Sequence, residues 1–388
     1  MLNNLQNIPV IIIFDPRGIF SKGNLDVIKR HKEYGKILSK LSPQVNTKLV
    51  VFSTYSSCKI IGVNTDYFNF FQISNPTINS FSFARKALSL IKNKSWDVKL
   101  IIASDPWESF WASYFFKHFF RIIAPIQMQI HGDIGDKTWK KINFRNRLRF
   151  SLAKLSIPRA DCYRLVSKTQ AKNLQKSFKI EPNLIDVIPV PIKVYSKKQI
   201  KYDNNSRPFS LALVGRIHPD RGIWDFVTLI KKLNQVSISF KVIIIGSNNS
   251  KVSKKFTLEL KSLLPANRLI ILNNLPQKDL FRHWKNIGTL VSLAPVESYG
   301  RAMREALIHG VPVWATKSSG SRELQKHFTG GQFKYLNLNK NPTKLLYDLN
   351  LLNKSKVNLK SIDQFIVKNE NFSANLVKSW LRIINTCI

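Results

Sequence analysis

Two carboxylates, Glu297 and Glu305, lie on either side of a glycine in the stretch A-P-V-E-S-Y-G-R-A-M-R-E. Carboxylate oxygens accept hydrogen bonds from hydroxyl groups, so two of them around a tight turn could hold a ribose or another sugar. Residues 289–293 before them form a short apolar run, and residues 300–309 carry apolar side chains at helical spacing. The pattern predicts a strand, a tight turn and a helix, with Glu297 in the turn and Glu305 on the helix.

The predicted turn is also suited to an anion. The backbone amides of Ser298, Tyr299 and Gly300 would point along the helix axis, where the helix dipole favours a negative group such as a diphosphate. Gly300 lets the backbone approach a ligand closely. The pair of glutamates alone is equally well explained as two solvated charges on a helix, so the site needs support from elsewhere in the chain.

A second candidate site lies upstream. The apolar run 211–214 is followed by G-R-I-H-P-D-R-G and then by an amphipathic helical pattern over 223–233. This arrangement places Gly215, Arg216 and Arg221 in a loop at the end of a strand. Guanidinium groups match the geometry of phosphate oxygens. The alternative is ordinary surface charge, because the chain holds 61 Lys and Arg residues.

Together the two segments resemble the retaining glycosyltransferases of family 4, within the glycosyl transferases group 1. That family shows a G-R loop, a strand ending in glycine, a Glu-x7-Glu element with an internal glycine, then G-x-P-V and G-x-x-E. Arg221 stands where the family usually has lysine, and the positive charge is kept. The matching positions are Gly215, Arg216, Arg221, Gly222, Gly246, Glu297, Gly300, Glu305, Gly310, Pro312, Val313, Gly320 and Glu323.

The resemblance implies an α/β protein of the GT-B fold, with two Rossmann-like domains whose parallel sheets face each other across a cleft. The chain of 388 residues is long enough for two such cores. We expect an acceptor-binding domain over 1–195 and a nucleotide-sugar-binding domain over 196–372, with the polar segment 193–208 as the boundary. A helix over about 373–388 should pack back on the first domain.

The N-terminal half matches the family more loosely. An apolar run at 10–14 leads into D-P-R-G, but Gly18 and Gly23 are separated where the family has an adjacent pair. The resemblance places Gly18, and Asp105 of the S-D-P-W segment, on the acceptor side. It places His131, which follows the apolar run 126–130, near the donor sugar. The alternative for His131 is a capped histidine at the end of a strand.

The resemblance also implies a mechanism. Arg216, Arg221 and the amides near Gly300 would stabilise the charge that grows on the diphosphate, in place of a metal ion. No metal or other cofactor is expected beyond the nucleoside-diphosphate sugar, since the sequence has no Asp-x-Asp element at a strand end. Glu297 would orient the sugar rather than attack it. The nucleotide base of the donor would be recognised near Asn274 and Leu275.

The net charge of +38 has two competing explanations. In one, residues 139–154 form a basic amphipathic helix that lies on an anionic membrane surface. In the other, the charge is compositional and Leu148, Leu152 and Leu155 pack into the core. Nucleic acid is not expected as a partner, because the lysines are spread along the chain and no base-reading motif is present.

The cysteines Cys58, Cys162 and Cys387 are scattered, which indicates neither a disulfide framework nor a zinc site. No signal peptide and no apolar run near 20 residues is evident, so we expect a cytoplasmic protein, peripheral on the inner face of the plasma membrane if the basic helix binds there. The expected function is sugar transfer to a glycan or lipid-linked acceptor in cell-envelope polysaccharide or glycolipid biosynthesis. The alternative is a non-catalytic protein of the same fold that binds nucleotide-sugar or membrane glycolipid.

Overall fold

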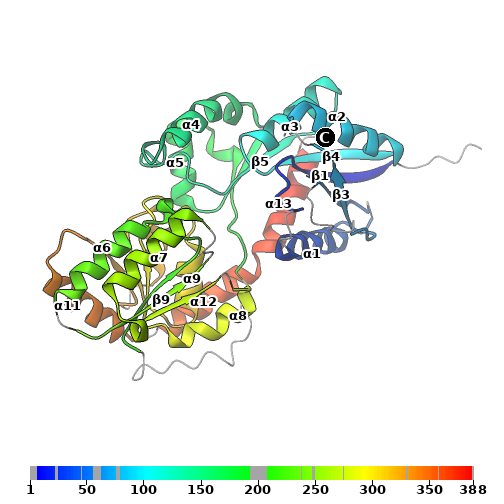
Figure 1. Cartoon of the computed structure of the whole chain (residues 1–388). Coiled ribbons are helices and arrows are strands. Elements are labelled where there is room, and N and C mark those ends of the chain that lie inside the picture. Colours follow the sequence, from blue (N-terminus) through cyan, green and yellow to red (C-terminus); the bar gives the residue numbers. More distant parts are fainter. Residues whose placement is uncertain are drawn as a thin grey trace, which may run out of the picture. The chain divides into compact units, whose positions relative to one another are not determined.

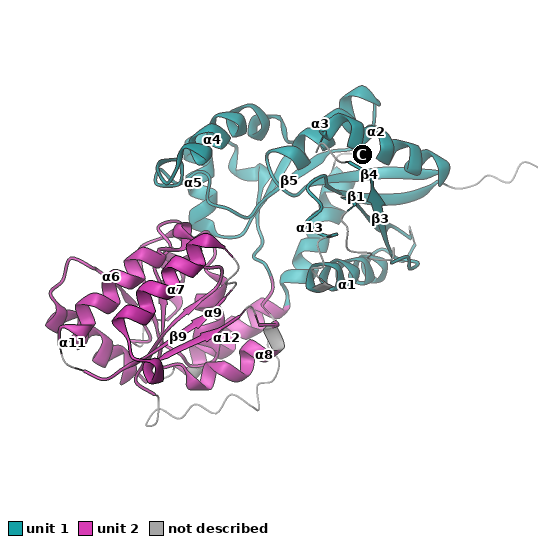
Figure 2. Ribbon diagram, in the orientation of Figure 1, with its two compact units in different colours: residues 1–190, 371–388 teal, residues 191–370 magenta. Residues whose placement is uncertain are grey.

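The computed structural model describes residues 7–21, 25–44, 46–55, 63–75, 79–192, 208–236, 238–246, 250–273, 275–328, 331–356 and 358–386. The chain forms two compact units (Figures 1 and 2). Unit 1 consists of Met1–Val190 and Asn371–Ile388, and unit 2 of Pro191–Glu370. Each unit is an α/β layer structure built on one parallel sheet.

Unit 1 contains a seven-stranded parallel sheet in the order β3-β2-β1-β4-β5-β6-β7. The first strand is apolar throughout its middle because both faces of the sheet are covered. The strands are β1 (Ile8–Asp15), β2 (Lys48–Thr54), β3 (Phe68–Ile73), β4 (Trp96–Ala103), β5 (Ile126–Ile130), β6 (Cys162–Leu165) and β7 (Ile185–Val187).

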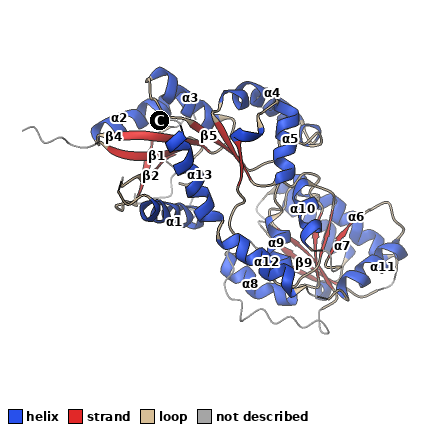
Figure 3. Cartoon of the chain, turned by 180° about the vertical axis from the view of Figure 1, so that it is seen from behind, coloured by secondary structure: helices blue, strands red, loops and turns tan. Residues whose placement is uncertain are grey.

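The two faces of this sheet carry different helices (Figure 3). Ile11 and Ile13 pack toward α1 (Leu25–Leu41) and α13 (Phe372–Thr386), whereas Ile12 and Phe14 pack toward the opposite layer. That second layer contains α2 (Ser80–Asn93), α3 (Glu108–Phe119), α4 (Phe144–Ser156) and α5 (Lys168–Phe178).

Helix α13 completes unit 1 although it follows unit 2 in the sequence. Trp380 is fully buried, with its ring 5.9 Å from that of Tyr34 on α1. Its Nε1 donates a hydrogen bond of 3.0 Å to Oε1 of Gln127 on β5. Arg382 and Ser379 of the same helix contact Asp186 on β7. The last helix therefore fills the face of the sheet that α1 leaves open.

Unit 2 contains a six-stranded parallel sheet in the order β10-β9-β8-β11-β12-β13. Its strands are β8 (Ser210–Val214), β9 (Lys241–Ile245), β10 (Leu269–Leu272), β11 (Thr289–Ser292), β12 (Val313–Ala315) and β13 (Phe333–Tyr335). Helices α6 (Ile223–Asn234), α7 (Lys251–Leu263) and α11 (Pro342–Asn353) pack on one face. The other helices are α8 (Gln277–His283), α9 (Arg301–Ile308), α10 (Ser319–His327) and α12 (Leu359–Glu370).

Short 3-10 turns link several of these elements, namely Trp139–Lys141, Ile157–Arg159, Pro182–Leu184, Pro219–Arg221, Ala266–Arg268 and Trp284–Asn286. The basic helix expected over 139–154 instead begins at Phe144, because Oδ1 of Asn143 accepts a hydrogen bond of 2.8 Å from the amide of Asn146 and caps it there. None of the helices in the described part of the chain has the length and apolar character of a membrane span.

The predicted fold class of two Rossmann-like units with parallel sheets is confirmed. In each sheet the chain order reverses beside one central strand, between β1 and β4 in unit 1 and between β8 and β11 in unit 2. In sheets of this kind, ligands bind beyond the carboxyl ends of the strands at such a switch point. The loops after β8 and β11 are therefore the first place to look for a site in unit 2.

Candidate active site

The loop after β8 is shaped by glycines. Gly222 has a φ of +68°, and a Cβ built on it would lie 2.2 Å from the carbonyl oxygen of Leu293, which follows β11. Only glycine fits there, because the conformation is left-handed and the neighbouring backbone is too close. The two loops at the switch point are thus in direct contact. Arg216 and Arg221 project from the first of them.

The loop after β11 forms the tight turn that the sequence predicted. Gly300, with a φ of +72°, caps α9, and its amide donates a hydrogen bond of 3.2 Å to Oε1 of Glu297. The backbone carbonyl of Glu297 accepts a bond of 2.7 Å from the amide of Gly320, at the start of α10. These two bonds fix the position of the Glu297 carboxylate at the carboxyl end of the sheet.

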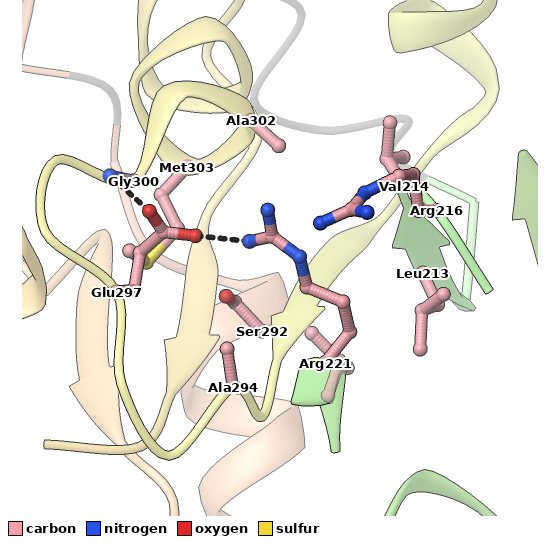
Figure 4. Close-up of a pocket in the computed structure, with 11 residues that line it drawn as sticks. Leu213, Val214, Arg216, Arg221, Ser292, Ala294, Glu297, Gly300, Ala302 and Met303 are labelled. Atoms are coloured by element: carbon pink, nitrogen blue, oxygen red, sulfur yellow. Dashed lines mark hydrogen bonds and ion pairs between the residues drawn. The ribbon is translucent and has the colours of Figure 1, made fainter. Parts of the chain in front are cut away.

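One pocket of unit 2 is lined by both loops (Figure 4). Nη1 of Arg221 pairs with Oε2 of Glu297, and Figure 4 shows the Arg221 guanidinium between Glu297 and Arg216. Two guanidinium groups against one carboxylate favour an anionic ligand. The lining consists of Leu213, Val214, Arg216, Arg221, Val291, Ser292, Ala294, Glu297, Gly300, Ala302 and Met303.

Glu305 lies further along α9, outside the lining of this pocket. Glu305 is buried, and its Oε1 accepts a hydrogen bond of 3.0 Å from Nε of Arg301, one turn earlier on the helix. Ser298 and Tyr299, whose amides were expected to face an anion, are buried within the turn. Gly215 follows β8 directly with a φ of +133°.

Arg304 is a feature of the site that the sequence did not reveal. It is 3% exposed, and its guanidinium lies 3.7 Å from the centre of the Tyr299 ring and 3.6 Å from Oε2 of Glu323. Burial lowers the pKa of Arg304, and the charge of Glu323 opposes that shift. The buried Arg304 guanidinium stabilises the turn through its contacts with Tyr299 and Glu323. In the sequence it looks like one more basic residue of a helix.

His131 lies at the end of β5 in unit 1. Although its side chain reaches solvent, desolvation by the surrounding protein lowers its pKa to about 3, with further contributions from Arg164 and Arg30. The imidazole is therefore neutral at physiological pH. Arg164 itself is buried on β6, where it donates hydrogen bonds to Oε1 of Gln129 at 2.9 Å and to the carbonyl of Ile188 at 3.0 Å.

The expected acceptor-side residues are held in place by contacts with other segments of unit 1. Gly18 has a φ of +66°, and a Cβ on it would lie 2.9 Å from the carbonyl oxygen of Thr54. Asp105 is buried and forms an ion pair with Arg17, and it also accepts a bond of 2.8 Å from the amide of Trp107. Burial raises the pKa of Asp105, and Arg17 counteracts this.

A second acidic residue, Asp15, ends β1 at the same switch point and was not singled out in the sequence. It is buried and accepts hydrogen bonds of 2.8 Å from the amide of Phe20 and from Oγ of Ser53. Burial raises its pKa, and these two bonds lower it. Its position directly after an apolar run was the signal in the sequence that could have identified it.

Other predicted residues lie apart from the pocket or outside the described part of the chain. Asn274 is outside the described residues, and Leu275 is half-buried beyond the end of β10. Two aspartates that were not predicted as site residues hold the loop after His131: Asp133 accepts a bond of 3.0 Å from Nδ2 of Asn173, and Asp136 accepts one of 2.7 Å from the amide of Thr138. Cys58 and Cys387 fall outside the described residues, as does Gly23.

The comparisons with solved structures define the fold. Sucrose-phosphate synthase from Thermosynechococcus elongatus is similar with a TM-score of 0.71 and 14% identity, over 97% of this chain and 99% of that one. Alr3699/HepE of Anabaena in complex with UDP and glucose is similar with a TM-score of 0.65 and 16% identity, over 96% and 100%. A glycosyltransferase from Rickettsia africae matches with a TM-score of 0.64 and 14% identity, over 98% and 99%. The fold is GT-B.

Residues 195–360 match the family model described as glycosyl transferases group 1. The matched range includes both loops that line the pocket. No curated protein matches the sequence. The resemblance to GT-B glycosyltransferases of group 1 is thereby confirmed, while the assignment to family 4 stays a prediction.

Proposed function

We propose that this protein is a retaining glycosyltransferase that moves a sugar from a nucleoside-diphosphate sugar to a glycan or lipid-linked acceptor. The observation that carries the proposal is the meeting of Arg216, Arg221 and Glu297 in one pocket, at the switch point of the sheet and within the family match. The Anabaena structure in complex with UDP and glucose supports a uridine nucleotide as one donor class to test.

In this proposal the diphosphate binds the two guanidinium groups. Arg221 now pairs with Glu297, and a phosphate group would compete for the same guanidinium. The carboxylate of Glu297 would then be free to accept hydrogen bonds from hydroxyls of the donor sugar. As the bond from the anomeric carbon to the phosphate oxygen breaks, Arg216 and Arg221 stabilise the charge on the leaving diphosphate. We propose on this basis that transfer needs no divalent cation.

Retention follows in the proposal if the acceptor hydroxyl attacks from the side on which the diphosphate leaves. The acceptor oxygen forms the new bond to the anomeric carbon, and its proton passes to the departing phosphate oxygen. Glu297 orients the sugar in this scheme and forms no covalent bond with it. The neutral imidazole of His131 is our candidate in unit 1 for a contact to the donor sugar.

We propose an acceptor of cell-envelope polysaccharide or glycolipid synthesis, reached from the cytoplasmic side of the membrane. The sugar, the nucleotide and the linkage are decided by individual pocket contacts, which no motif in the sequence identifies. The donor class can be tested directly on the purified protein.

The test is a thermal-shift screen with UDP, GDP, ADP and their common sugar conjugates, with and without magnesium. A ligand that binds only the folded protein raises the melting temperature. We expect one nucleotide to raise Tm independently of magnesium, with the shift lost in Arg216→Ala and kept in Arg282→Ala, an exposed arginine outside the pocket. Nucleotide binding without any sugar transfer or donor hydrolysis would instead support the non-catalytic alternative.

A further inference from the structure

Helix α4 of unit 1 carries a row of apolar side chains that point away from the protein. Phe144 is 76% exposed, and three leucines at positions 148, 152 and 155 are 54%, 43% and 51% exposed. At about 100° per residue, these four side chains lie within about 80° of one another on the helix. This contradicts the expectation, under the compositional reading of the charge, that the leucines pack into the core. We call these four residues the α4 stripe.

The outward direction of the α4 stripe is set by contacts on the opposite side of the helix. Ala153 and Ser156 are buried there, and the Phe150 ring lies 5.3 Å from that of Phe178 on α5. Nε1 of Trp107 also donates a hydrogen bond of 3.1 Å to the carbonyl oxygen of Arg149. One face of α4 therefore packs against the rest of unit 1, and the α4 stripe on the opposite face is exposed to solvent.

Cations flank the α4 stripe on both sides. On the helix, Arg147 and Lys154 lie on one side of the stripe and Arg145 lies on the other. Arg149 lies beyond Arg145, with its guanidinium 4.6 Å from the centre of the Trp107 ring. The segment 137–160 contains no acidic residue. Its basic residues are Lys137, Lys140, Lys141, Arg145, Arg147, Arg149, Lys154 and Arg159.

This arrangement identifies the kind of surface that fits. A narrow apolar row between two rows of cations is typical of a helix that lies in the plane of a membrane interface, with lipid phosphates beside the cations. A nucleic acid would leave the apolar row exposed to water. A second copy of this chain would bring an equally basic segment against this one, in a molecule with a net charge of +38.

We propose that α4 docks unit 1 on an anionic lipid bilayer, with the α4 stripe among the acyl chains and the flanking cations at the headgroup phosphates. A second exposed apolar cluster lies in the same helix layer, where Phe119 is 63% and Ile123 is 97% exposed and the Phe81 ring lies 5.3 Å from that of Phe119. The inference goes beyond the proposed transfer reaction, because vesicle binding requires neither donor nor acceptor.

The experiment is flotation of the full-length protein with vesicles of phosphatidylcholine alone, or of equal parts phosphatidylcholine and phosphatidylglycerol. We expect binding to the anionic vesicles, weakened by at least about tenfold in Leu148→Ser/Leu152→Ser. The matched control is Leu258→Ser/Leu351→Ser, which removes two exposed leucines of unit 2, at 66% and 45% exposure, and should bind as wild type does.

A second pair of variants tests the charge. Arg145→Glu/Arg147→Glu should abolish binding to the anionic vesicles, whereas Lys251→Glu/Lys254→Glu lowers the net charge equally at exposed positions of α7 and should retain most of it. Far-ultraviolet circular dichroism and Tm establish that each variant is folded.

Three results would overturn the proposal. The first is that the wild-type protein does not float with anionic vesicles. The second is that the stripe variant Leu148→Ser/Leu152→Ser and its leucine control bind equally well. The third is that size-exclusion chromatography shows a dimer that only the stripe variant loses. The last result would assign the α4 stripe to a contact between copies. A protein that floats but transfers no sugar would refute the proposed function and leave this inference standing.

Discussion

Replacing Glu297 by alanine should separate catalysis from folding and from nucleotide binding. The substitution removes the ion pair between Glu297, whose side chain is 18% exposed, and Arg221, whose side chain is 39% exposed. It also removes the hydrogen bond from the amide of Gly300. A pair this exposed contributes at most about 1 kcal/mol, and the capping bond about 1 kcal/mol more. The free energy of unfolding should fall by about 1–2 kcal/mol, which is a drop in Tm of about 2–8 °C for a domain of this size.

Sugar transfer by the Glu297→Ala variant should fall to below about a tenth of the wild-type kcat, since the carboxylate that orients the sugar is lost. Nucleotide affinity should be kept or improved, because Arg221 no longer has a competing carboxylate. Steady-state kinetics and calorimetric titration with the nucleotide measure the two effects. Glu259→Ala, on the surface of α7, is the control and should match wild type in both. Residual activity above about a tenth, or loss of nucleotide binding, would refute the role given to Glu297.

Three further outcomes are expected. Arg216→Ala should weaken nucleotide binding by about ten- to a hundredfold in calorimetry with an unchanged Tm, since the side chain is exposed, and unchanged turnover would move the phosphate site elsewhere. Gly222→Ala should lower the free energy of unfolding in urea by about 2 kcal/mol or more, because its Cβ would meet Leu293, and a wild-type midpoint would contradict this. Burial lowers the pKa of His31, whose ring lies 4.7 Å from that of Phe20 and 5.2 Å from that of Tyr34, to about 3 from an unfolded value of about 6.5, so the folded state binds fewer protons and loses stability as pH falls below about 6.5. The Tm of wild type should therefore drop more than that of His31→Gln between pH 7 and pH 5, and equal drops in the two proteins would contradict this.

Much of the site in unit 2 could be predicted because its parts are short and local. The G-R loop and the Glu-x7-Glu element each consist of a strand, a turn and a helix, and both are found at the expected places. Their meeting also follows from topology, since β8 and β11 are neighbours in a sheet whose switch point lies between them. Arg221 and Glu297 are thus brought together although they are 76 residues apart.

The residues that escaped prediction are those whose surroundings come from distant parts of the chain. Arg304 is buried by Tyr299 and Glu323, and nothing in M-R-E distinguishes it from a solvated arginine. Asp15 accepts a hydrogen bond from Ser53, which is 38 residues away in the sequence. The periodicity of α4 was read correctly as amphipathic, but an apolar row has the same spacing whether it faces a core or a solvent-exposed surface. Only the docking of the opposite side on the sheet decides which one it is.

The position of Trp380 has a consequence for synthesis of the protein on the ribosome. The side chain fills the face of the first sheet next to Tyr34, yet it emerges after every residue of unit 2 has been made. Until then Leu38, Leu49 and Val51, which belong to the same core as Trp380, lack the helix that covers them in the finished protein. All residues of unit 2 are therefore made before unit 1 can close its sheet, although the synthesis of unit 1 starts earlier. A ribosome that stalls before α13 is made would hold a chain whose first sheet is open on one side.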